Sequence, residues 1–282
     1  MEPTRGSVMD TTAEFSREEL SAATVPLRRV PKVTVACKTD IGCVRENNED
    51  KFEFFLPESE PLLAVRGYVF VVCDGMGGHA AGQIASEIAC KSFLYAYLHH
   101  ESADPEEAAR TAVSHANRFV LDAARAIPER RGMGCTLSAL MLVQDRAITA
   151  QVGDSRVYRL RDGDLTQLTA EHTFVEELVA GGLMDRETAS RDPRSHVLTR
   201  AVGVEDSVEP EIAAHDLLPK DVFLLCSDGI TNLVSNERIA EVLPLPPSEA
   251  AWTLVNDALQ AGGHDNATAL VVRVDDIVPT DS

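Results

Sequence analysis

Residues 71–82 read VVCDGMGGHAAG, an apolar run that ends in an aspartate and continues into a stretch with four glycines. The same pattern returns three times, in QVGDS (151–155), LLCSDG (224–229) and GGHDN (262–266). An ordinary turn would explain any one of these acids, because Asp and Gly are common turn residues. Four carboxylates beside strongly apolar runs instead predict a crowded, partly buried acidic site that needs a counter-charge. The four aspartates are Asp74, Asp154, Asp228 and Asp265.

The chain of 282 residues, 44% of them hydrophobic, is long enough to bury a large core. The first 32 residues are polar and lack the hydrophobic centre of a signal peptide, so we expect them to form a flexible tail. No linker-like stretch interrupts the middle of the chain. We therefore predict an N-terminal tail at 1–32, one catalytic domain at 33–276 and a short C-terminal tail at 277–282.

Periodicity gives the fold class. Seven runs rich in branched residues predict strands: KFEFF, GYVFVVC, CTLSALMLV, AITAQVG, RVYRL, VFLLCS and ATALVVRV. Helical spacing marks 81–98, the segment after Pro105, a short piece at 173–181, and a helix from Pro247 with Ser248 as its N-cap. Asp162-Gly163 between two strand-like runs predicts a hairpin. Consecutive hairpins with grouped helices favour an α+β sandwich.

Composition excludes several classes of function. A formal charge of −19 argues against a nucleic-acid partner, because phosphate backbones are bound by concentrated Lys and Arg. No segment reaches the length of a membrane span. The six cysteines form no CxxC pair, which favours reduced core thiols and a cytoplasmic protein.

The counter-charge for the four acids is best supplied by a divalent cation, since few basic residues lie near them in sequence. Carboxylate ligands without His or Cys favour Mg²⁺ or Mn²⁺ over Zn²⁺. Glycine after two of the acids, as at Gly75, leaves room for a backbone carbonyl or a water molecule to approach.

An ordered set of motifs resembles bacterial metal-dependent serine/threonine phosphatases of the protein phosphatase 2C (PPM) type. The motifs are RENNED (45–50), the opening stretch, GMGCT, VGDSRVYRL, LTAEHT, SHVLTRAVG, LLCSDGI and GGHDNATALVV. The resemblance implies a two-layer antiparallel β-sandwich flanked by helices on both sides, with two Mn²⁺ or Mg²⁺ ions at one end. Two departures from the family pattern are Glu171 in place of aspartate before His172, and Cys135 in place of threonine.

The resemblance also implies roles for particular residues. Asp74 would bridge the two ions and Gly75 would offer its carbonyl, while Asp228 and Asp265 would complete the first ion. Asp154, with Asp228, matches the position of a weaker third ion, and Glu49 that of a ligand acting through water. Asp50 and Asn266 would orient these ligands from behind. The segment 181–203 resembles the family's flap, a cover beside the active site.

Two further residues have expected roles in the reaction. Arg45 would bind the substrate phosphate, because a planar guanidinium matches two phosphate oxygens. His79 has two interpretations, a proton donor to the leaving oxygen or a cap of the following helix. Paired ions lower the pKa of a shared water and neutralise phosphoryl oxygens, so water attacks directly.

The resulting hypothesis is a monomeric cytoplasmic phosphatase that acts on phosphorylated proteins and opposes a serine/threonine kinase. A catalytically silent phosphoprotein-binding module is the second hypothesis, and loss of a metal aspartate would have supported it. A nuclease is the third, and the acidic charge argues against it.

Overall fold

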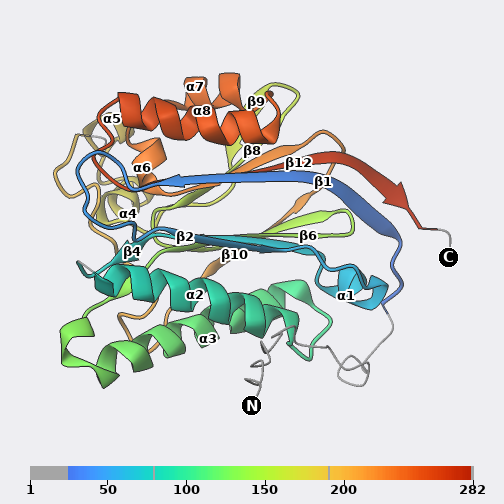
Figure 1. Ribbon diagram of the computed structural model, residues 1–282, viewed down its shortest axis with the longest axis horizontal. Coiled ribbons are helices and arrows are strands. Elements are labelled where there is room, and N and C mark those ends of the chain that lie inside the picture. The colour runs from blue at the N-terminus through green and yellow to red at the C-terminus, as the bar shows by residue number, and fades with distance from the viewer. Residues whose placement is uncertain (1–24, 79, 190, 281–282) are drawn as a thin grey trace, which may run out of the picture.

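The computed structural model describes residues 25–280 except 79 and 190. Two five-stranded sheets lie face to face, and helices cover the outer side of each (Figure 1). Every strand pair in them is antiparallel. The predicted α+β fold, a two-layer antiparallel β-sandwich flanked by helices, is therefore confirmed.

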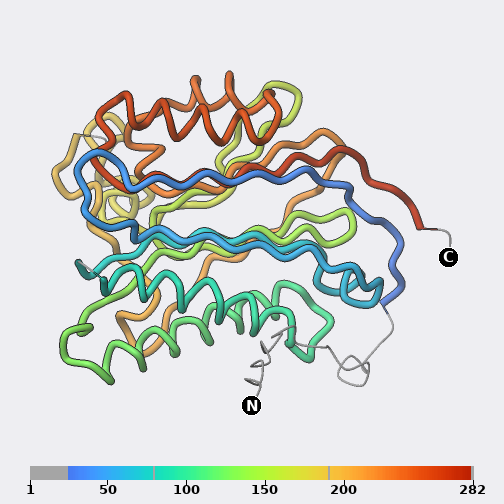
Figure 2. Tube along the Cα trace, viewed as in Figure 1, coloured from blue at the N-terminus to red at the C-terminus, as the bar shows by residue number. Residues whose placement is uncertain are grey.

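The first sheet joins the two ends of the described chain. Its strands, in spatial order, are β1 (Arg29–Asp40), β12 (Ala267–Pro279), β11 (Val222–Cys226), β8 (Arg156–Arg161) and β9 (Asp164–Gln167). β1 pairs with β12 from end to end, and Figure 2 shows the two segments running side by side. The pairing includes residues 29–32 and 277–279, which were predicted to belong to the two tails. Both strands therefore extend past the predicted domain bounds of 33 and 276.

The second sheet has the order β10 (Glu211–Asp216), β7 (Arg146–Val152), β6 (Leu137–Val143), β3 (Tyr68–Cys73) and β2 (Lys51–Phe55). A two-stranded ribbon of β4 (Gly75–Met76) and β5 (Gly134–Cys135) follows at one end. β6 is buried along its whole length, which explains its continuous apolar sequence.

Two long helices, α2 (Ala80–Leu98) and α3 (Pro105–Ala126), pack against the second sheet. Asp104 caps α3 by accepting a hydrogen bond from the Glu106 amide, and Pro105 occupies the first turn, where no N–H is needed. On the first sheet lie α7 (Asn236–Val242) and α8 (Pro247–Gln260).

Shorter helices complete the structure: α1 (Glu60–Val65), the 3₁₀ turn Pro128–Arg130, α4 (Phe174–Ala180), α5 (Arg186–Ala189) and α6 (Asp228–Thr231). Within residues 25–280, leaving aside 79 and 190, no helix combines the length and apolar character needed to cross a membrane.

The predicted N-cap of α8 was wrong, because Pro246 holds that position and Ser248 lies inside the helix.

The core between the sheets fixes their distance and so the position of every strand end. Its fully buried members include Phe70 and Leu140 from the second sheet and Phe223, Leu225 and Leu270 from the first. Interdigitating side chains of this size set the spacing of two packed sheets.

We predict that Phe223→Ala lowers the free energy of unfolding by about 3–5 kcal/mol, because it leaves a cavity between the sheets. Phe119→Ala is the matched control, since Phe119 is 50% exposed on α3 and its truncation leaves no buried cavity. Urea unfolding measures both, and equal losses for the two variants would contradict this account of the core.

Candidate metal centre

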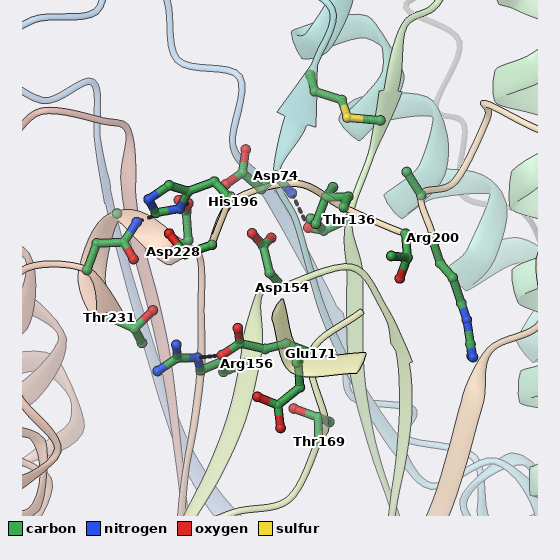
Figure 3. A pocket seen from close by; sticks show the side chains of 18 of the residues that line it. Asp74, Thr136, Asp154, Arg156, Thr169, Glu171, His196, Arg200, Asp228 and Thr231 are labelled. Carbon is green, nitrogen blue, oxygen red and sulfur yellow. Dashed lines mark hydrogen bonds and ion pairs between the residues drawn. The ribbon is translucent and has the colours of Figure 1, made fainter. Parts of the chain in front are cut away.

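The predicted acids meet in a cleft of about 2180 Å³ at one end of the sandwich. Asp74 follows β3, Asp154 lies between β7 and β8, Asp228 follows β11, and Asp265 precedes β12. All four line the cleft, together with Glu49 from the turn before β2. In Figure 3 the carboxyl groups of Asp74, Asp154 and Asp228 point toward a common space. Segments far apart in sequence thus bring their acids to one place.

Asp74 is held in place by its backbone. Its amide donates a 2.8 Å hydrogen bond to the Thr136 hydroxyl, which in turn contacts the hydroxyl of Ser155 at 2.7 Å. Thr136 is the residue after Cys135, so the motif retains one threonine hydroxyl at this point. Sequence reasoning did not identify Thr136 as a support for Asp74.

Gly75 explains part of the glycine-rich turn. Its amide donates to the Glu49 carbonyl at 3.2 Å, and a Cβ built on Gly75 would lie only 2.2 Å from the carbonyl oxygen of Gly82. Any side chain here would force the turn away from α2. The bare turn therefore serves close backbone packing as well as access to the cleft.

Asp50 and Asn266 lie behind the cleft acids. Asp50 is 2% exposed, and it accepts a 2.6 Å hydrogen bond from the hydroxyl of Ser227, the residue before Asp228. Asn266 accepts a hydrogen bond from the Glu49 amide at 2.8 Å and donates to the carbonyls at 41 and 47. These contacts tie the Glu49 turn, β11 and β12 to one another.

Crowding shifts the ionisation of the acids. Burial, reinforced by the charges of Asp50 and Asp228, raises the pKa of Asp74 well above its usual range. Burial also raises the pKa of Asp50 to about 7, against the lowering effect of the Ser227 hydrogen bond. Burial and then Asp228 raise the pKa of Asp154 to about 7. The carboxylates therefore repel one another in the absence of a cation.

Several basic side chains among the described residues also line the cleft. Arg45 donates a 2.6 Å hydrogen bond to Asp265 while remaining half exposed in the cleft. Arg156 forms an ion pair with Glu171. Glu171 stands where the family pattern has aspartate, and its longer side chain makes this contact. His196 of the 181–203 segment has its Nδ1 3.9 Å from Asp228 Oδ2. His79 lies outside the described residues.

The donor set fits a hard divalent cation. One carboxyl oxygen of Asp50 and one of Asp228 are buried without a hydrogen-bond partner, so they have unused acceptor capacity. Oxygen ligands of this kind suit Mg²⁺ and Mn²⁺. In the described part of the chain, no three His, Cys, Asp or Glu side chains lie close enough together to coordinate a metal ion as they stand.

Comparison with known proteins agrees with this geometry. The family model described as protein phosphatase 2C matches residues 46–267. The chain therefore belongs to the protein phosphatase 2C family, which confirms the resemblance seen in the motifs.

Individual relatives carry consistent names. The chain is 37% identical over 242 residues to the serine/threonine protein phosphatase PstP of Mycobacterium tuberculosis, covering 86% of this chain but only 45% of PstP. It is 36% identical to the serine/threonine phosphatase stp of Listeria monocytogenes, covering 84% of this chain and 94% of stp. The solved PstP catalytic domain in complex with two manganese ions has a TM-score of 0.74 at 34% identity, covering 87% and 98% of the two chains.

We predict that the metal-free protein loses stability as the pH rises from about 4 to about 7. The pKa values of Asp50 and Asp154 are raised in the folded state above the ordinary value of about 4, so protonation favours folding and ionisation opposes it. The melting midpoint in EDTA should be lower at pH 8.0 than at pH 5.5, by about 2–4 °C for each kcal/mol lost.

The variant Asp154→Asn provides the control for this pH dependence. It removes one of the titrating carboxyl groups, so its melting midpoint in EDTA should exceed that of the wild type at pH 8.0 and change less with pH. A wild-type midpoint that stays constant, or rises, between pH 5.5 and 8.0 would contradict the electrostatic account.

Proposed function

We propose that the chain is a metal-dependent protein serine/threonine phosphatase that hydrolyses phosphoserine and phosphothreonine. The observation that carries the proposal is the meeting of Asp74, Asp154, Asp228 and Asp265 in one cleft of a protein phosphatase 2C chain. The names of the relatives, PstP and stp, support the same reaction.

Two divalent ions are the proposed cofactors, Mn²⁺ or Mg²⁺, and a third is a further proposal at Asp154 and Asp228. When bound, such ions supply an activated water and neutralise phosphoryl oxygens. Asp74 would hold both ions, with Asp228, Asp265 and the Gly75 carbonyl as further ligands and Glu49 acting through water. Asp50 and Asn266 would fix these ligands, as their contacts with Ser227 and the Glu49 amide support.

Arg45 is the proposed phosphate-binding residue. Its guanidinium lies in the cleft beside Asp265 and is 52% exposed, so donors remain available for a ligand. His79 keeps its two interpretations, proton donor or helix cap.

The proposed substrates are phosphorylated proteins, and the proposed counterpart is a serine/threonine kinase. We also propose a monomer that acts in the cytoplasm. Six free thiols support a reducing compartment, because exposed Cys43 in particular would be prone to oxidation elsewhere.

The test of the proposed function is phosphate release from a phosphothreonine peptide with Mn²⁺, set against the same reaction in EDTA. We expect release that depends on Mn²⁺. Folded protein that binds Mn²⁺ yet releases no phosphate from phosphoserine or phosphothreonine peptides would instead favour the silent binding module.

We predict that Asp228→Asn lowers kcat/KM by about 100-fold or more while the protein stays folded, because the change weakens a metal ligand at constant volume. Asp164→Asn on β9 is the matched control, since that acid is exposed outside the cleft, and should leave activity unchanged. Equal activity of the two variants would remove Asp228 from its assigned role.

Arg45→Lys tests the proposed phosphate contact. Lysine keeps the charge but loses the planar fork, so we expect KM for the phosphopeptide to rise by about 10-fold while Mn²⁺ affinity changes little. Steady-state kinetics at saturating Mn²⁺ measures the effect. An unchanged KM would show that the guanidinium does not bind the phosphate.

A further inference from the structure

His172 lies where two parts of the site meet, at the junction between the turn that carries Asp154 and the segment 181–203. The residue is 6% exposed and follows Glu171 directly. The sequence analysis mentioned His172 only as the residue after Glu171. None of the metal-site roles described above belongs to it.

Backbone hydrogen bonds join His172 to both sides. Its amide donates to the Gly153 carbonyl at 2.8 Å, and its carbonyl accepts from the Thr199 amide at 2.8 Å. An isolated antiparallel bridge between Thr173 and Leu198 continues the second contact. Residues 172–173 therefore connect the returning end of the 181–203 segment to the turn between β7 and β8.

The imidazole adds a hydrogen bond to the same turn. The Gly153 amide donates to His172 Nδ1 at 3.3 Å, so Gly153 is bound through both its N–H and its C=O. This contact requires an unprotonated Nδ1, which places the ring proton of the neutral tautomer on Nε2. Nε2 then lies 4.0 Å from Glu211 Oε2, and the Arg200 guanidinium nitrogen 3.5 Å away does not donate to it. Burial, then the charge of Arg200, lowers the pKa of His172 to about 4, so the ring is neutral at physiological pH.

The turn has little freedom on its opposite side. Gly153 has a φ of +96°, and a Cβ built there would lie 2.6 Å from Thr136 Cγ2. Thr136 is the residue that binds the Asp74 amide and touches the Ser155 hydroxyl. Residues 153–155 are thus held between Thr136 and His172, with the Asp154 carboxyl facing the cleft (Figure 3).

We propose that His172 is a positioning residue for Asp154: its Nδ1, by accepting the Gly153 N–H, sets the direction of the Asp154 carboxylate and links it to the 181–203 segment. This inference rests on the proposed function, in which Asp154 binds an ion. Loss of the acceptor leaves the Gly153 amide without its hydrogen bond to the ring. The turn is then held by its packing against Thr136 and by the hydrogen bond from the His172 amide to the Gly153 carbonyl. The ion at Asp154 then binds more weakly, while the ions at Asp74 and Asp265 are affected less.

Two substitutions separate the imidazole contact from simple packing. His172→Asn places an amide oxygen near the position of Nδ1, so it keeps an acceptor for Gly153. His172→Gln extends further and places its polar atoms near Nε2, so it loses that acceptor. Titration of each folded variant with Mn²⁺, following free Mn²⁺ by electron paramagnetic resonance, measures ion binding without reference to activity.

We expect His172→Gln to weaken the weakest Mn²⁺ site by about 10-fold and His172→Asn to bind within about 3-fold of wild type. Asp154→Asn should remove the same weak site, so adding His172→Gln to it should cause no further change. The inference is overturned if Asn and Gln bind alike, if all ions weaken equally, or if the double variant shows an additive loss. Melting in EDTA establishes that each variant is folded.

The outcomes distinguish this inference from the proposed function. Wild-type protein that binds Mn²⁺ but releases no phosphate overturns the phosphatase proposal, and the Mn²⁺ titration still decides the role of His172. Normal phosphatase activity with identical Mn²⁺ binding by the Asn and Gln variants overturns only the role of His172. Failure of the wild type to bind Mn²⁺ overturns both.

Discussion

Mutual repulsion among carboxylates at one end of the sandwich is the constraint on which the rest of the structure depends. Asp74, Asp154 and Asp228 face one space, and burial makes their ionisation costly. Only a rigid scaffold can hold such groups together without a cation. The two sheets supply it, because β3, β11 and β12 are paired strands within packed layers and their ends cannot move apart independently.

Supports behind the acids have the same purpose. Thr136 fixes the Asp74 backbone, and Ser227 binds the buried Asp50. Each support is a short polar side chain with a defined partner, as expected where a buried group must not be left without a hydrogen bond. A site of this kind lowers the free energy of unfolding, because the carboxylates repel one another and apolar residues at the same positions would not. Function and stability are therefore opposed at this end of the molecule.

The sequence predicted the framework well and the contacts less well. Apolar runs located β3, β6, β11 and β12, because a strand buried in a sandwich needs that pattern over its whole length. β1 and β10 were missed, since both are edge strands that are only partly buried and carry a weak signal. The meeting of the four aspartates was predicted from their shared position beside apolar runs, and the family resemblance added the role of each. The contact between His172 and Gly153 has no sequence signature, because nothing in a spacing of 19 residues indicates it.

Above all, we propose that the crowded acids are a binding site for divalent cations. Anomalous diffraction at the manganese edge, from crystals grown with Mn²⁺, tests it most directly. We predict two strong peaks in the cleft beside Asp74, one of them also within bonding distance of Asp228 and Asp265. Fully occupied manganese peaks elsewhere on the protein, with none beside Asp74, would contradict the account.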